Sequence, residues 1–178
     1  MKVRVATIAD AKAIEEICAE NLVQNRQDLA EKEGFLVTKV TESDAQKMIG
    51  DLHHLCLAAE SEGEIVGYLT ACRLDKSGAD TLSQVSILEI SKKLPQEKII
   101  FYKHIAKKVG YNGVGSALLE TLIKTAKEKN FKTIICRIIH QPIKNLASIA
   151  FHQKFGFRLE GERERSDGYV AGLYVKNL

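Results

Sequence analysis

The sequence predicts a single α/β (α+β) domain on a mixed sheet, and three observations support this fold class. Two apolar runs on either side of a tight turn, between residues 54 and 73, predict an antiparallel hairpin. Two strand-like runs between residues 99 and 139 are each followed by a helical pattern, so strands and helices alternate there. No internal repeat, low-complexity tract or linker divides the 178 residues, a length that suits one sizeable core.

A short strand and two helices are expected before the hairpin. Residues 2–6 alternate polar and apolar side chains, which predicts the strand. Thr7 and Asp10 fit a capping box with Asp in place of Glu, and apolar spacing then predicts a helix over residues 8–24. A second cap signature at residues 41–44 begins another helix. Its expected apolar stripe consists of Ala45, Met48, Ile49 and Leu52.

Two segments leave alternatives open. Within residues 25–40, Gly34–Val37 fits either a short extended piece or an extension of the first helix. Residues 74–97 contain a predicted loop at 75–80, and then a β-branched run at 84–90 that fits helix or strand. Long segments of this kind often help to bind a ligand.

The remaining elements have clearer patterns. A nearly continuous apolar run at residues 133–139 is typical of a central strand. The full expected set is strands at 54–60, 64–73, 99–106, 133–139, 157–164 and 169–176, with helices at 113–129 and 145–155.

Composition excludes several classes of protein. Hydrophobic residues make up 45% of the chain and charged residues 28%, with a net charge of +3, and no basic stripe interleaved with aromatics predicts a nucleic-acid interface. The N-terminus lacks a signal-peptide pattern and no run is long enough to span a membrane, so we expect a cytoplasmic protein. The four cysteines have no metal-ligand spacing, which predicts buried, reduced thiols and no metal site. They are Cys18, Cys56, Cys72 and Cys136.

The most informative stretch runs from Lys98 to Ser116, where a strand-like run passes through Gly110, Gly113 and Gly115 into a helix. The first N–H groups of a helix have no partner in that helix, and the helix dipole favours negative charge there. Glycines let phosphate groups approach the backbone closely. The stretch therefore predicts a phosphate cradle, against the alternative of a plain loop-to-helix connection.

Two familiar phosphate motifs do not fit this stretch. A P-loop requires Lys followed by Ser or Thr after the last glycine, and the chain has Ser116-Ala117 there. A dinucleotide fingerprint requires GxGxxG, whereas these glycines occur in the reverse order and after an antiparallel hairpin.

The stretch resembles the acyl-CoA pyrophosphate loop of the GNAT superfamily of N-acetyltransferases, [Gln/Arg]-x-x-Gly-x-[Gly/Ala]. Gly113-Val114-Gly115 matches the end of that loop, while Gly110 replaces the Gln or Arg. Residues 145–157 are similar to the family's segment after its fifth strand, and most similar to that of phosphinothricin acetyltransferase-like members.

This resemblance implies one GNAT domain over residues 1–178, with a mixed, mostly antiparallel sheet of about seven strands and about four helices. It implies an acetyl-CoA-dependent N-acetyltransferase that transfers acetyl directly to a primary amine of a small molecule, amino acid or peptide, without a metal. A protein N-terminal or lysine acetyltransferase and a non-catalytic acyl-CoA sensor are the alternatives. Members of the family often form homodimers.

The resemblance also assigns residues to three tasks: holding CoA, polarising the thioester and protonating the leaving thiolate. A backbone N–H near Ile105 would polarise the carbonyl, and Lys107 and Lys108 either add positive charge or form a solvated surface pair. Asn145 would touch the CoA arm, cap its helix, or do both. The loop residues expected to bind the cofactor are Gly110, Tyr111, Asn112, Gly113, Val114, Gly115 and Ser116.

His152 is the expected catalytic acid, because many relatives have tyrosine there and Asn145, seven residues earlier, points roughly the same way. An imidazolium, with a reference pKa of about 6.5, would give its proton downhill to a thiolate of about 8.5. The alternative is a packed, hydrogen-bonded histidine. No general base stands out among Glu89, His104, Tyr102, Glu97 and a water chain, and His53, His54 and His140 are expected to be structural or at the surface.

Overall fold

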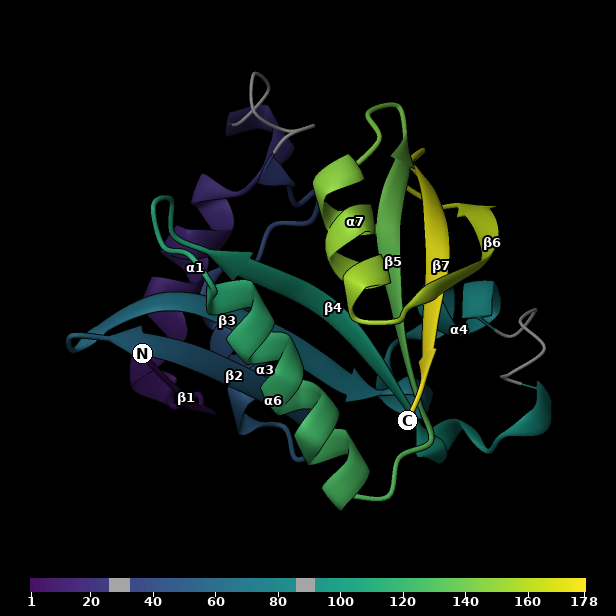
Figure 1. Cartoon of the computed structure of the whole chain (residues 1–178), viewed down its shortest axis with the longest axis horizontal. Helices are drawn as coiled ribbons and strands as arrows, with labels where there is room; N and C mark the ends of the chain where they lie inside the picture. Colours follow the sequence, from purple (N-terminus) through teal and green to yellow (C-terminus); the bar gives the residue numbers. More distant parts are fainter. Residues whose placement is uncertain (26–32, 86–91) are drawn as a thin grey trace. The chain divides into compact units, whose positions relative to one another are not determined.

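The computed structural model describes residues 1–25, 33–85 and 92–178, and Figure 1 shows the course of the chain. The chain divides into two compact units. The first consists of Met1–Gln27, Phe35–Ala71 and Lys103–Thr125, and the second of Asp28–Gly34, Cys72–Tyr102 and Ala126–Leu178.

Within the described residues, seven strands form a mixed sheet in the order β1-β2-β3-β4-β5-β7-β6. The β4–β5 pair is parallel, and the β1–β2, β5–β7 and β6–β7 pairs are antiparallel. These pairings confirm the predicted α/β (α+β) fold on a mixed sheet. The strands are β1 (Lys2–Val5), β2 (His54–Ser61), β3 (Glu64–Arg73), β4 (Ile99–Lys107), β5 (Thr133–Gln141), β6 (Arg158–Glu164) and β7 (Val170–Asn177).

The helices also follow the predicted order. The described α-helices are α1 (Ala11–Glu20), α3 (Glu42–Gly50), α4 (Ala79–Val85), α6 (Val114–Glu128) and α7 (Leu146–Lys154). Both C-terminal helices, α6 and α7, lie within one residue of their predicted bounds at each end.

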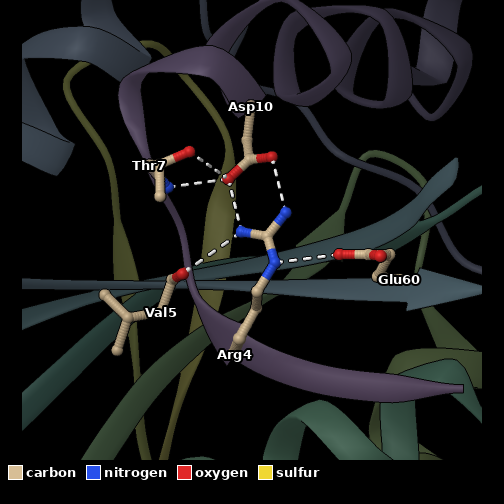
Figure 2. A network of polar contacts seen from close by, with 5 residues as sticks. All are labelled: Arg4, Val5, Thr7, Asp10 and Glu60. Atoms are coloured by element: carbon tan, nitrogen blue, oxygen red, sulfur yellow. Dashed lines mark hydrogen bonds and ion pairs between the residues drawn. The ribbon is translucent and has the colours of Figure 1, made fainter. Parts of the chain in front are cut away.

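In the first unit, an arginine on β1 organises the entry into α1 (Figure 2). Two Arg4 nitrogens donate to the two Asp10 carboxylate oxygens at 2.7 and 2.9 Å, and its Nε donates to Glu60 on β2 at 2.9 Å. Asp10 also accepts from the Thr7 N–H at 2.7 Å, as the capping-box pattern predicts. The Arg4 hydrogen bonds hold the pKa of Asp10 below its usual range.

The predicted helix over residues 8–24 is too long. A 3₁₀ turn, Ile8–Asp10, precedes α1, which ends at Glu20. The Asn21 side chain donates back to the Ile17 carbonyl at 2.8 Å, and Leu22 then forms a parallel bridge with Leu36. Of the alternatives for Gly34–Val37, the extended piece is therefore the correct one.

A complete capping box begins α3: Asp44 N donates to Thr41 Oγ1 at 3.2 Å, and Thr41 N donates to Asp44 Oδ2 at 3.1 Å. Leu52 was wrongly assigned to the apolar stripe of this helix. The helix ends at Gly50, where Asp51 adopts an extended conformation, and Leu52 is 98% exposed.

In the second unit, the two faces of the sheet differ. One face carries an apolar cluster that includes Ile99, Phe101, Ile135 and Leu173. The other carries Tyr102, Cys136 and Tyr174, which are paired in register across β4, β5 and β7 and so point to one side. The β4–β5 ladder ends at Tyr102 and Cys136, although β5 continues to Gln141.

The segment 74–97 is more helical than predicted. A 3₁₀ turn occupies Leu74–Lys76, where a loop was expected, and α4 begins at Ala79. Gln84 and Val85 belong to α4, which settles the start of the 84–90 run as helix. The rest of that run, including the candidate base Glu89, lies outside the described residues.

Candidate functional site

In the first unit, the glycine loop between β4 and α6 leaves space beside its backbone. Gly110 and Gly113 have φ values of +87° and +76°, and a Cβ on either would meet no atom within 4 Å. The helix α6 begins directly afterwards at Val114, so its first N–H groups have no acceptor within the helix. Left-handed glycines, open space and unpaired helix N–H groups together suit an anion such as phosphate.

A glycine on β3, which the sequence analysis missed, fixes where α6 begins. A Cβ on Gly67 would lie 2.4 Å from Val114 Cγ1 and 3.0 Å from the Ala106 carbonyl oxygen. The first residue of α6 therefore packs directly on the backbone of β3, and Val114 is fully buried. An isolated glycine within a strand pattern is the signal that could have indicated this close approach.

A second missed residue, Glu64, holds two side chains of the loop. Its Oε1 accepts from Lys108 Nζ at 2.5 Å and its Oε2 from the Tyr111 hydroxyl at 3.0 Å. The Lys108 N–H also donates to the Val66 carbonyl at 2.9 Å. Hydrogen bonds from Lys108 and Tyr111 lower the pKa of Glu64. Of the two predicted lysines, Lys108 is thus held in an ion pair beside the loop.

The first-unit part of β4 carries Ile105, which is half-buried, between two residues with polar contacts. His104 Nδ1 lies 3.4 Å from the hydroxyl of the buried Tyr68. The carbonyl of Lys107 accepts from the Asn21 side chain at 3.0 Å.

In the second unit, His152 lies on α7 and is only 2% exposed. Its Nδ1 is 2.5 Å from the Ser148 carbonyl oxygen. Because a carbonyl only accepts, Nδ1 carries the proton, and Nε2 accepts from the Tyr102 hydroxyl. Burial lowers the pKa of His152 to about 4, although the Ser148 hydrogen bond opposes this.

His152 is therefore a neutral imidazole at pH 7. The predicted transfer of a proton from a His152 imidazolium to the thiolate therefore lacks its donor at pH 7. Participation of His152 in catalysis stays a prediction, with Tyr102 now identified as its direct partner.

Asn145 is the N-cap of α7. Its Oδ1 accepts from the Ser148 N–H at 3.2 Å, and its own N–H donates to the Ile139 carbonyl at 2.9 Å. The predicted capping role is confirmed, and its contact with CoA stays a prediction.

A second histidine centre, also missed, lies on β5. His140 Nδ1 is 2.5 Å from Glu162 Oε1, and its Nε2 is 3.1 Å from the Tyr174 hydroxyl. The three residues come from three neighbouring strands and are far apart in sequence, so no local pattern indicates them. His140 is buried and has two partners, so of the predicted alternatives the surface location is wrong and the structural one agrees with the burial.

The remaining predictions concern the cysteines, membrane-spanning segments and metal sites. The four cysteines are free and buried. Among the described residues, no helix has the length and apolar character needed to cross a membrane. Within residues 1–25, 33–85 and 92–178, no group of three His, Cys, Asp or Glu side chains is arranged to hold a metal ion.

Comparisons with known proteins identify the family and the fold. The acetyltransferase (GNAT) family profile matches residues 21–157, and no curated protein sequence matches significantly. Similar solved structures include a ribosomal-protein-alanine N-acetyltransferase from Brucella melitensis, at 22% identity over 100% of both chains with a TM-score of 0.69. Another is yncA from Salmonella typhimurium with its cofactor acetyl-CoA, at 18% identity over 100% of this chain and 94% of that chain, TM-score 0.70. A third is Arabidopsis thaliana NAA60 with a bisubstrate analogue, at 15% identity over 99% and 98% of the chains, TM-score 0.67.

Proposed function

Because this chain belongs to the acetyltransferase (GNAT) family, we propose that it transfers an acetyl group from acetyl-CoA directly to a primary amine of a small molecule, amino acid or peptide. The observation that carries the proposal is the open glycine loop before α6. Gly110 and Gly113 leave room beside the backbone, and the N–H groups of Val114, Gly115 and Ser116 begin the helix without intrahelical acceptors.

In this proposal the loop backbone from Gly110 to Ser116 binds the pyrophosphate of acetyl-CoA. Lys108 adds a positive charge that Glu64 holds beside the loop. Replacement of the family's Gln or Arg by Gly110 removes one side-chain contact, so backbone N–H groups and the helix dipole carry more of the binding. The β4 backbone near Ile105 polarises the thioester carbonyl, and Asn145 contacts the CoA arm.

The chemistry requires charge stabilisation at three points of one reaction. The amine nitrogen becomes positive as it attacks the carbonyl carbon of the thioester. The carbonyl oxygen becomes negative, and the sulfur of CoA leaves as a thiolate. The N–H of neutral His152 donates to Ser148 and its Nε2 accepts from the Tyr102 hydroxyl, so His152 would act on the leaving group only through Tyr102, and an imidazolium at pH 7 is not its source of protons.

Two matched glycine variants test the cofactor site. Gly113→Trp fills the space beside the loop, and we expect it to abolish acetyl-CoA binding in a calorimetric titration. Gly168→Trp is the control, because Gly168 lies in the β6–β7 turn with a similar φ of +83° and the same open surroundings. Normal affinity in Gly113→Trp would show that the cofactor binds elsewhere.

Thiol release from acetyl-CoA tests the reaction itself. The wild-type protein is mixed with a peptide that begins with alanine, a free amino acid and a diamine, and release above the amine-free background is expected with at least one of them. The alanine peptide is included because similar solved structures include a ribosomal-protein-alanine N-acetyltransferase. Binding of acetyl-CoA without release in the presence of any amine would favour the non-catalytic sensor instead.

A further inference from the structure

Glu162, His140 and Tyr174 form a hydrogen-bonded relay within the second unit. His140 lies on β5, Glu162 on β6 and Tyr174 on β7, so three neighbouring strands each supply one member. The carboxylate reaches one nitrogen of the imidazole at 2.5 Å, and the tyrosine hydroxyl reaches the other at 3.1 Å. A base that is oriented by a third group is the arrangement that activates hydroxyl groups in catalytic triads.

The direction of each proton follows from the partners. An ionised carboxylate only accepts, so His140 Nδ1 carries a proton and donates it to Glu162. His140 Nε2 is then an acceptor, and the Tyr174 hydroxyl donates to it. The proton of Tyr174 is committed to His140, which leaves the lone pairs of its oxygen to accept from another donor.

Packing holds these side chains in place. A Cβ on Gly172 would lie 2.6 Å from His140 Nε2 and 2.8 Å from Tyr174 Cε2, so only glycine leaves room for the two rings there. The rings meet edge to face, with centroids 5.8 Å apart. The His140 side chain is 5% exposed and that of Glu162 is 51% exposed, so the relay connects a buried hydroxyl to solvent.

The relay lies on the same face of the sheet as Tyr102. Tyr102, Cys136 and Tyr174 are consecutive in register across three strands. His140 follows Cys136 by four residues, beyond the point where the β4–β5 ladder ends. The relay therefore lies beside the last residues of β5, after Cys136. In the described residues, this part of β5 still pairs with β7 along one edge and no longer pairs with β4 along the other.

We propose that Tyr174, backed by His140 and Glu162, is the general base that takes the proton from the acceptor amine. This inference rests on the acetyl transfer proposed above. As the amine nitrogen bonds to the thioester carbon, its proton passes to the Tyr174 oxygen while the hydroxyl proton of Tyr174 passes to His140 Nε2. The C–S bond then breaks with its electron pair on sulfur. The thiolate takes one proton from solvent, and the imidazolium returns one to solvent past Glu162.

Kinetics of three relay variants, Tyr174→Phe, His140→Gln and Glu162→Gln, and of one control test the relay, using the amine that gives the highest thiol release with the wild-type protein. Tyr174→Phe and His140→Gln are expected to lower kcat/KM by about 10²- to 10⁴-fold, the usual contribution of general base catalysis. Acetyl-CoA affinity should stay within about twofold, because the loop of the first unit is untouched. Glu164→Gln is the matched control, a second exposed carboxylate on the same strand.

The pH profile, together with the free energy of unfolding, separates a positioning role of Glu162 from a structural one. The titratable groups that face the relay are Glu162 on β6, Tyr174 on β7 and Cys136 on β5. Burial raises the pKa of Cys136, so that thiol stays neutral. Glu162→Gln removes the acceptor that orients the His140 imidazole, so it should lower kcat/KM across pH 6–9 with acetyl-CoA affinity unchanged, whereas a structural role would also lower the free energy of unfolding.

Nitrogen-15 NMR of the imidazoles gives a readout that does not depend on turnover. The expected spectrum of His140 shows a protonated Nδ1 and an unprotonated Nε2, and the Nε2 signal shifts in Tyr174→Phe. An Nε2-protonated tautomer would overturn the proposal, as would wild-type kcat/KM in Tyr174→Phe across pH 6–9. A wild-type protein that binds acetyl-CoA and releases no thiol with any amine overturns both this proposal and the proposed function, whereas an active wild type with an unaffected Tyr174→Phe variant overturns only the relay.

Discussion

At the scale of a single residue, the buried imidazole of His152 makes the stability of the protein depend on pH. Its pKa is about 4 in the folded state and about 6.5 when exposed, so between these values the unfolded chain binds more protons. Stability is fully present above pH 6.5 and is lost as the pH falls to 4, by at most about 3 kcal/mol. Urea unfolding at pH 7 and pH 4.5, followed by circular dichroism, should show this loss.

In His152→Gln the part of the acid destabilisation that belongs to this histidine should disappear. His53→Gln is the matched control, because His53 is exposed, and it should retain the full loss. Equal losses in the wild type and His152→Gln would show that His152 is not buried as a neutral imidazole.

Two aspartates in equivalent capping positions differ in one partner. Asp10 and Asp44 each accept from the N–H of a capping threonine, and only Asp10 also binds Arg4 through both oxygens. We expect Asp10→Asn to destabilise the protein by about 2 kcal/mol, because it leaves a partly buried guanidinium without its main partner. Asp44→Asn should cost clearly less, since Asp44 is exposed. Equal effects in chemical unfolding would mean that Arg4 contributes nothing beyond the cap.

At the scale of elements, Gly67 links the packing of α6 to the glycine loop. Gly67→Ala forces a methyl group against Val114 and the Ala106 backbone. We expect a loss of about 1–3 kcal/mol in stability, the usual cost of overpacking. Weaker acetyl-CoA binding should accompany it, because the first turn of α6 must shift.

Gly50→Ala is the control for Gly67→Ala, since a Cβ on Gly50 meets no atom within 4 Å. Gly50 lies at the end of α3, where alanine is tolerated at least as well. Acetyl-CoA affinity and unfolding free energy should both stay near wild-type values there. Wild-type stability in Gly67→Ala would contradict the close approach of β3 and α6.

Most elements could be predicted from local patterns, and the errors have physical causes. Capping boxes at Thr7 and Thr41 and the glycine loop are signals within a few residues of sequence. The true end of α1 depends on the Leu22–Leu36 bridge, a contact that no local pattern contains. Leu52 has helical spacing, yet Asp51 has already turned the chain.

The candidate site divides in the same way. Residues 110–116 could be predicted because consecutive residues form the loop. Glu64 and the partners of His140 could not, because their contacts join residues that are 22 to 47 positions apart in the sequence. The buried state of His152 was also out of reach, since it depends on Tyr102, 50 residues earlier.

At the scale of the whole molecule, the chain passes between its two compact units twice near the glycine loop, and each time it does so inside a strand or a helix. The chain passes from the second unit to the first between Tyr102 and Lys103, within β4, and back between Thr125 and Ala126, within α6. Neither position is a flexible linker, so we expect thermal unfolding in one cooperative transition. Two separate transitions would contradict this.

Acetyl-CoA should raise the temperature of that single transition. A ligand that binds only the folded state at 100 times its Kd stabilises it by about 2.7 kcal/mol, which corresponds to about 5–10 °C for a chain of this length. The wild-type chain has no tryptophan, so circular dichroism is the appropriate probe. Gly113→Trp should melt without a cofactor-dependent shift and Gly168→Trp with the wild-type shift, because only the first fills the space beside the loop. A full shift in Gly113→Trp would place the cofactor away from the glycine loop, whatever the protein then does with amines.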